Sequence, residues 1–222
     1  MQLFFPLRTA AAVFVLSAAA LCQSTPAQEA PPKESQIKGL PPRPTPGDYQ
    51  AHAQAGNVTI AADFTEHAIS TPETTLSSED FVAVEVAFFG PPDAKLKLSH
   101  EDFTLHITGK KAPVAAVQYG IVYRSLKDPA WEPPAPPSKS KTGINTGGDE
   151  KDSNAPPPIV HIPIEVERAM QQRVQKAALP EGERSLPSAG LIFFPFRGKT
   201  KNIKSIELVY EGPAGKTSLR LH

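Results

Sequence analysis

The stretch Ile206–Leu221, with the sequence IELVYEGPAGKTSLRL, contains two segments of alternating apolar and polar residues around a glycine-rich loop. Alternation with a period of two is typical of a strand that has one buried face. Taking Gly212–Gly215 as a four-residue loop pairs Tyr210 with Thr217, Leu208 with Leu219, Ile206 with Leu221, Glu211 with Lys216 and Glu207 with Arg220. Opposite charges then face each other on the outer side, and such cross-strand pairs contribute about 0.2–1 kcal/mol each. The stretch predicts an antiparallel hairpin with a defined register.

A second hairpin is predicted over residues 103–116, where Gly109 and Lys110 suit a two-residue turn with glycine first. This turn pairs Phe103 with Ala116, Leu105 with Val114 and Ile107 with Ala112. All six side chains then lie on one apolar face, while Thr104, His106 and Thr108 lie on the other, as a solvent-facing side requires.

Three further segments have the composition of strands. One face of residues 58–64 carries Val58, Ile60, Ala62 and Phe64, and one face of residues 82–88 carries Val82, Val84, Val86 and Phe88. Residues 191–196 form an apolar run that ends, bulges or follows a sheet edge at Pro195, because proline cannot donate to a ladder. Together with the hairpins, these segments predict an all-β fold, an antiparallel β-sandwich of about seven to nine strands.

One added α-helix is predicted over about residues 163–179. Its apolar positions are spaced by three and four, as in an amphipathic helix, and are Val166, Ala169, Met170, Val174 and Ala177. Pro163 suits the first turn, and Pro180 and Gly182 end the helix. The stripe is interpreted as docking on the sheets; the alternative is a helix that binds a partner.

Proline is concentrated in two segments that we expect to be disordered. Seven of the 25 prolines lie in residues 26–46, and eight lie in residues 129–158. Segments of this kind bury too little apolar surface to offset the entropy lost on ordering. The prediction is a disordered linker over residues 23–56 and a single domain over residues 57–222, interrupted by a disordered loop over residues 132–158.

Residues 1–22 have the pattern of a secretory signal peptide, with a short basic head, an apolar run from Thr9 to Leu21 and small residues near its end. The run is shorter than the about 20 residues that span a bilayer. The only cysteine, Cys22, is lost by cleavage before Gln23, kept by cleavage after Ala20, or acylated as a lipid anchor. We expect an exported protein, periplasmic, envelope-associated or extracellular, with no membrane span after cleavage and no intramolecular disulfide.

Charge and motifs argue against several classes of ligand. Lys and Arg total 23, Asp and Glu also total 23, and this balance disfavours nonspecific binding to nucleic acid or to an anionic membrane. Two Gly-Lys-Thr triplets, at residues 198–200 and 215–217, are each expected to open a strand. A phosphate loop needs a glycine five positions before the Gly-Lys pair, where this chain has Phe193 and Tyr210. No nucleotide or other cofactor is predicted.

Residues of catalytic type are scattered along the chain. His100 and His106 flank Glu101 and Asp102, an arrangement that is either a weak metal cluster or a solvated strand entry. Paired carboxylates for glycoside cleavage are recognised only by their separation in space. The carboxylates available for such a pair are Asp63, Glu66, Glu79, Asp80, Glu101 and Asp102. No catalytic, cofactor-binding or metal-binding residue is assigned from the sequence.

The single tryptophan, Trp131, lies where the second proline-rich segment begins. Aromatic faces suit sugar rings and proline, so Trp131 is a candidate contact surface for a ligand or wall polymer. The other interpretation is that its ring caps the core at the end of a strand.

The mature chain resembles a family of uncharacterised exported bacterial proteins, a resemblance that implies no known activity. The stretches that carry it are residues 39–43, GLPPR, then 125–134, 169–177, 190–198 and 210–216. The last thirty residues also resemble the closing strands of immunoglobulin-like modules of secreted bacterial proteins. Such modules bind or support other molecules, although a fold alone does not fix a function.

The sequence therefore favours a non-enzymatic, exported immunoglobulin-like module of the cell envelope or extracellular space, which binds an envelope or extracellular protein or polymer. The first alternative is a secreted hydrolase whose carboxylate or metal site is hidden in the sequence. The second is an assembly subunit that pairs through its edge strands.

Overall fold

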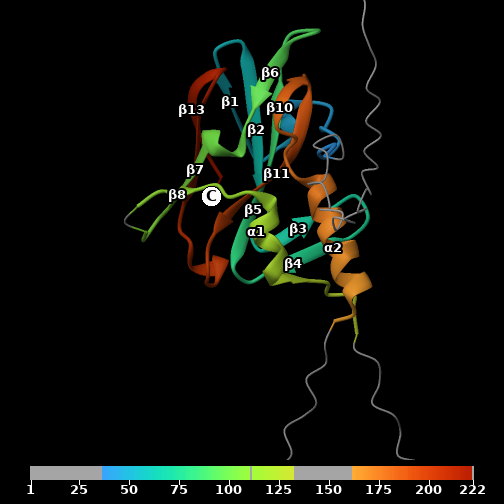
Figure 1. Ribbon diagram of the computed structural model, residues 1–222. Coiled ribbons are helices and arrows are strands. Elements are labelled where there is room, and N and C mark those ends of the chain that lie inside the picture. The colour runs from blue at the N-terminus through green and yellow to red at the C-terminus, as the bar shows by residue number, and fades with distance from the viewer. Residues whose placement is uncertain (1–36, 111, 133–161, 222) are drawn as a thin grey trace, which may run out of the picture. The chain divides into compact units, whose positions relative to one another are not determined.

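The computed structural model describes residues 37–110, 112–132 and 162–221 (Figure 1). The chain divides into two units, Met1–Pro32 and Lys33–His222, and every described residue belongs to the second unit. The predicted signal peptide with Cys22 and residues 133–158 of the predicted loop lie outside the described residues. What is described is mainly β, with several antiparallel sheets and two short helices, as the all-β prediction required.

The secondary structure consists of short strands, two α-helices and single 3₁₀ turns. The strands are β1 (Ala51–Ala55), β2 (Val58–Phe64), β3 (Ala68–Ser70), β4 (Thr75–Ser78), β5 (Phe81–Phe89), β6 (Lys95–Leu98), β7 (Phe103–Ile107), β8 (Val114–Ala115), β9 (Leu126–Lys127), β10 (Gly182–Ser185), β11 (Ser188–Pro195), β12 (Ile206–Gly212) and β13 (Gly215–Arg220). The α-helices are α1 (Tyr119–Val122) and α2 (Ile164–Ala177), and the 3₁₀ turns are η2 (Pro46–Asp48), η3 (His100–Asp102), η4 (Tyr123–Ser125) and η5 (Thr200–Asn202).

Two four-stranded sheets dominate the unit. Sheet I has the order β1-β2-β5-β11, and sheet II has the order β13-β12-β7-β8. Two smaller sheets, β3-β4-β9 and β10-β6, accompany them. All pairings between these strands are antiparallel, so each sheet can present one face to a core and the other to a cover or to solvent.

Both predicted hairpins form in the predicted register. Leu208 pairs with Leu219, and Glu207 with Arg220, while Glu211 receives a hydrogen bond of 2.8 Å from the Lys216 ammonium. In the other hairpin Leu105 pairs with Val114. Its apolar face is less buried than predicted, because Val114 is only half-buried and Ala112 is exposed at the short end of β8. The alternating pattern therefore predicts the register better than the depth of burial.

Sheets I and II share one hydrophobic core. Val82, Val84 and Val86 of β5 point into this core with Leu105 and Leu208 of sheet II. At one end, the rings of Phe88, Phe103 and Tyr210 meet with centroid distances of 5.2–6.0 Å. Aromatic pairs in this range add about 0.5–1.5 kcal/mol to the stabilisation from burial. The two sheets are thus joined by a filled apolar interior.

The opposite face of sheet I is also covered, in part by the helix that the sequence predicted to dock on the sheets. Helix α2 buries Met170, Val174 and Ala177 against Ala83 and Phe193 of sheet I, among other residues. Its stripe docks on a sheet, as interpreted, and Figure 1 shows α2 beside β3 and β4. Ion pairs from the α2 residue Arg173 to Glu73, at 2.9 Å, and to Asp128, at 3.6 Å, hold the exposed side of the helix.

The predicted linker over residues 23–56 is wrong for residues 37–56, which belong to the fold. Tyr49 is buried over a row of three alanines, Ala61, Ala87 and Ala189, that crosses sheet I. The Arg43 guanidinium stacks 4.4 Å from the centre of the Tyr49 ring. Proline content misled the prediction, because a few well-placed aromatic and basic residues are enough to hold an extended segment on a flat sheet face.

The outer edge of β11 is occupied along its length. Its carbonyls at Ala189, Leu191 and Phe193 accept backbone hydrogen bonds of 2.8–2.9 Å from Leu40, Leu179 and Val117, respectively. These contacts leave no unpaired strand edge on this side of sheet I. An assembly subunit that pairs through its edge strands would need such an edge. The contacts also bring the chain so close that a Cβ atom on Gly190 would lie 2.5 Å from the Leu179 Cα atom.

Gly190→Ala is therefore expected to lower the free energy of unfolding by about 1–3 kcal/mol, because backbone atoms on both sides must move apart. Gly120→Ala is the matched control, since nothing lies within 4 Å of its added Cβ atom and Gly120 is helical. Urea unfolding of the two variants measures the difference. Equal midpoints for both variants would show that the close approach at Gly190 does not constrain the fold.

Candidate functional site

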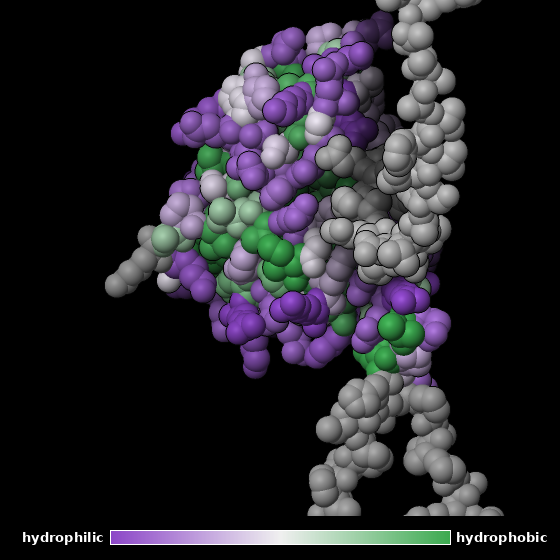
Figure 2. Space-filling view, viewed as in Figure 1, coloured by the Kyte–Doolittle hydropathy of each residue, from purple (hydrophilic) through white to green (hydrophobic). Residues whose placement is uncertain are grey.

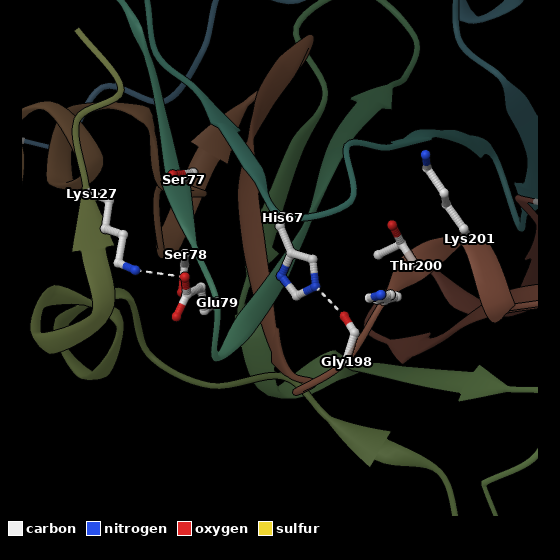
Figure 3. Close-up of a pocket in the computed structure, with 9 residues that line it drawn as sticks. His67, Ser77, Ser78, Glu79, Lys127, Gly198, Thr200 and Lys201 are labelled. Carbon is white, nitrogen blue, oxygen red and sulfur yellow. Dashed lines mark hydrogen bonds and ion pairs between the residues drawn. The ribbon is translucent and has the colours of Figure 1, made fainter.

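A groove lies between the β3-β4-β9 sheet and the β11–β12 connection (Figure 3). We call it the His67 groove, and its lining is His67, Ser77, Ser78, Glu79, Lys127, Gly198, Lys199, Thr200 and Lys201. Its cavity volume is about 740 Å³, which is within the about 300–1,000 Å³ range of ligand sites.

One wall of the groove is built by the pairing of β4 with β9. The Lys127 ammonium donates a hydrogen bond of 2.6 Å to the Glu79 carboxylate. Ser78 is buried, and its hydroxyl lies 2.7 Å from that of Ser125 and accepts a hydrogen bond from the Phe81 amide. Ser78 is therefore a structural hydroxyl that fixes this wall.

His67 lies between the two walls and joins them (Figure 3). Its Nδ1 atom is 2.9 Å from the Phe81 carbonyl oxygen, and its Nε2 atom is 2.8 Å from the Gly198 carbonyl oxygen. The His67 ring also packs 6.0 Å from the Phe196 ring. With both nitrogens facing backbone acceptors, the imidazole serves as a tie between β5 and the β11–β12 connection.

The β11–β12 connection forms the second wall. It carries Arg197, which donates to Asp80 at 2.6 Å, and Thr200, which donates to Glu66 at 2.6 Å. The first Gly-Lys-Thr triplet lies here, and the prediction that it opens a strand is wrong, because the single 3₁₀ turn η5 follows. The second triplet opens β13 as predicted.

Four of the six carboxylates considered for glycoside cleavage are held by separate partners. Glu66, Glu79 and Asp80 each accept from the group named above, and Asp63 forms an ion pair with Arg43. Arg43 also donates to Glu85 at 3.1 Å. Burial disfavours its charge, but hydrogen bonds and the charges of Asp63 and Glu85 outweigh that effect and raise the Arg43 pKa.

The predicted histidine cluster is not brought together. His100 bonds Glu181, while His106 is exposed on β7. Asp102 is half-buried, and burial followed by the charge of Glu101 raises its pKa. Among the residues that the structure describes, no group of three or more His, Cys, Asp or Glu side chains could hold a metal ion.

Trp131 is half-buried near the end of the described segment 112–132, where its amide closes a turn onto the Asp128 carbonyl at 3.1 Å. It is not a member of the hydrophobic clusters, and it does not line the His67 groove. His161 and His222 lie outside the described residues, and His52 is exposed on β1.

The site residues were missed because their signal is not local. His67 follows β2, and the lysines of the groove come from segments about 60 and 130 residues further along the chain. One local signal of the site is present in the sequence, the run Arg197–Lys204 with four cations and no carboxylate. Its position beside a histidine depends on the pairing of β5 with β11.

Comparisons of the chain with protein-family models, with curated proteins and with solved structures give no match.

No helix within residues 37–110, 112–132 and 162–221 is long and apolar enough to cross a membrane. On the face shown in Figure 2, hydrophilic residues predominate, and the large hydrophobic residues exposed among those described are Ile121 and Ile164.

His67→Ala is expected to loosen the β11–β12 connection, because the ring lies between the Phe81 and Gly198 carbonyls and packs on Phe196, and a hydrogen bond that it donates is worth about 0.5–1.5 kcal/mol in addition to the lost packing. A local loss of 1–2 kcal/mol increases the open population about 5–30-fold. Limited trypsin digestion measures it as faster cleavage after Arg197, Lys199 and Lys201. His52→Ala, at an exposed histidine, is the control. Equal cleavage rates for the two variants would contradict the tie.

The raised pKa of Asp102 predicts a pH dependence of stability. The folded protein holds this proton at a higher pH than the unfolded chain, so the stability contributed by Asp102 falls as pH rises from about 3.8 through the folded value. Asp102→Asn removes the titrating carboxyl group and with it this pH-dependent contribution to stability. Urea unfolding from pH 3 to pH 7 should therefore show the variant gaining stability over the wild type as pH rises. A constant difference across this range would refute the assignment.

Proposed function

We propose that this protein is an exported, non-enzymatic binding module built on an immunoglobulin-like β-sandwich. The support for the fold is the strand order. Strands β2-β5-β11 follow the order A-B-E, and β13-β12-β7-β8 follow the order G-F-C-C′ of immunoglobulin-like domains. The connection from the C′ position to the E position is long and carries α1, β9, α2 and β10.

The proposed sandwich departs from antibody domains in its core. Those domains have an inter-sheet disulfide and a buried tryptophan. Here the only cysteine, Cys22, lies outside the described residues, and the only tryptophan, Trp131, does not lie in sheet I or sheet II. The cluster of Phe88, Phe103 and Tyr210 joins the sheets instead, which suits a chain without an intramolecular disulfide.

The His67 groove is the proposed binding surface, and one observation carries this proposal. The groove is rigidly built, since His67, Ser78 and Thr200 are all committed to structural hydrogen bonds, yet it presents lysine side chains at its rim. Because both ring nitrogens of His67 face backbone carbonyl oxygens, neither nitrogen is placed to accept a proton from a hydroxyl nucleophile. This arrangement favours binding over the hydrolase alternative.

The proposed location is outside the cytoplasm, and it rests on the pattern of residues 1–22. An anchor at Cys22, a contact surface at Trp131 and a partner in the envelope or extracellular space belong to the same proposal. Fractionation of producing cells and mass spectrometry of the N-terminus test it. A chain retaining Met1 in the cytoplasm would refute export, whereas a mature start at Leu21, Cys22 or Gln23 supports it.

Binding is tested by co-sedimentation of the mature chain with isolated cell envelopes. We expect saturable binding that unlabelled protein displaces. Ser77→Trp, which fills the groove, should reduce binding at least tenfold, while Ser218→Trp, at an exposed site on β13, should not. Both variants should retain the wild-type unfolding midpoint. Absence of saturable binding, or equal binding by both variants, would overturn the groove as the binding surface.

A further inference from the structure

We infer that the His67 groove binds a polymer that carries repeated anionic groups, phosphate or carboxylate. This inference rests on the proposed function and adds the chemical class of the ligand. It starts from the connection between β11 and β12, where residues 197–204 read RGKTKNIK. Four of these eight residues are cations and none is a carboxylate, in a chain whose total charge is zero.

Two of the cations at the groove are neutralised by ion pairs, and two lysines are not. Arg197 is paired with Asp80, and Lys127 with Glu79. Lys199 and Lys201 line the groove, are exposed, and form no ion pair with any residue that the structure describes. Lysines on one wall of a concave site attract anions more strongly than the same charges spread over a convex surface.

The arrangement of the cations indicates more than one anionic group on the ligand. The unpaired Lys199 and Lys201 both belong to the β11–β12 wall, whereas Lys127 on the opposite wall is paired with Glu79 (Figure 3). A ligand that pairs with both unpaired lysines must present negative groups at an interval. The cavity volume of about 740 Å³ also exceeds what a single phosphate or carboxylate group fills.

The neutral part of the lining favours an anionic chain over a nucleic acid. Single-stranded nucleic acids are bound by stacking their bases on aromatic side chains. Apart from the imidazole of His67, the lining of the groove carries no aromatic ring, and it offers the hydroxyl of Ser77 instead. Hydroxyls and ammonium groups are donors to phosphate or carboxylate oxygens.

The test uses the mature chain and two probes, inorganic polyphosphate for the phosphate class and poly-glutamate for the carboxylate class. Binding is measured by titration calorimetry at 20 and 200 mM salt. We expect at least one probe to bind, and its affinity to fall by tenfold or more at the higher salt concentration because the contacts are ionic. A single-stranded oligonucleotide is titrated alongside, and tighter binding to it would overturn the assignment.

Charge-matched variants separate the groove from the general surface. K199Q/K201Q removes the two unpaired lysines of the groove and should weaken binding about tenfold or more. K38Q/K97Q removes two exposed lysines that lie outside the His67 groove and form no ion pair with a described residue, and it should weaken binding less than twofold. Equal losses in the two variants would show nonspecific attraction and overturn the inference.

The two proposals fail in different ways. If envelopes bind the chain in a manner that Ser77→Trp abolishes, while neither polymer binds, the groove is a binding surface but its ligand is not a polyanion. If neither envelopes nor polymers bind, both proposals are refuted. A groove that binds only one of the two polymers identifies the anionic group.

Discussion

Strand β5 is buried on both faces, and its two faces impose different constraints on what covers them. Toward sheet II it carries valines and Phe88, which fill the space between two sheets. Toward the opposite side it carries Ala83, Glu85 and Ala87, so that covering segments approach the backbone closely. The position of Tyr49 over the alanine row is a consequence of the small side chains among them. The rest of the unit is arranged around this doubly buried strand.

The charge on the covered face explains how the N-terminal segment is held. Glu85 is only 9% exposed, and a carboxylate in such a position needs a partner. Arg43 supplies it and contacts Asp63 of β2 as well, while its guanidinium stacks on Tyr49. Burial is the main reason that the Tyr49 pKa is raised. One arginine thus joins a proline-rich segment to two strands of sheet I.

Features formed by residues close together in the sequence were predictable, and features formed by distant residues were not. Hairpin registers were predictable, because alternation and turn residues lie within 16 positions, and Leu208 pairs with Leu219 as expected. Strand β11 ends at Pro195 and is the last strand of sheet I, as predicted from the inability of proline to donate a backbone hydrogen bond. Docking of the α2 stripe was predictable from its periodicity. The cover by Tyr49 and the His67 groove were not predictable, since Tyr49 meets Ala189 and His67 meets Gly198, each more than 100 residues further along the chain. Helix α1 was missed because its single turn shows no helical periodicity.

A net charge of zero describes a sum, and binding depends on where the charges lie. The fold separates them at the end of β11, where Pro195 closes the ladder and Phe196 donates its amide to the Asp80 carbonyl. From that point the chain leaves the sheet and carries its cations along the groove. His67 contacts the Gly198 carbonyl and so holds the chain where it leaves the sheet. The lysines that follow Gly198 are therefore held on one wall of the groove. The same proline that ends a strand therefore determines where the basic segment begins, and the local charge of the groove is a consequence of the sheet topology.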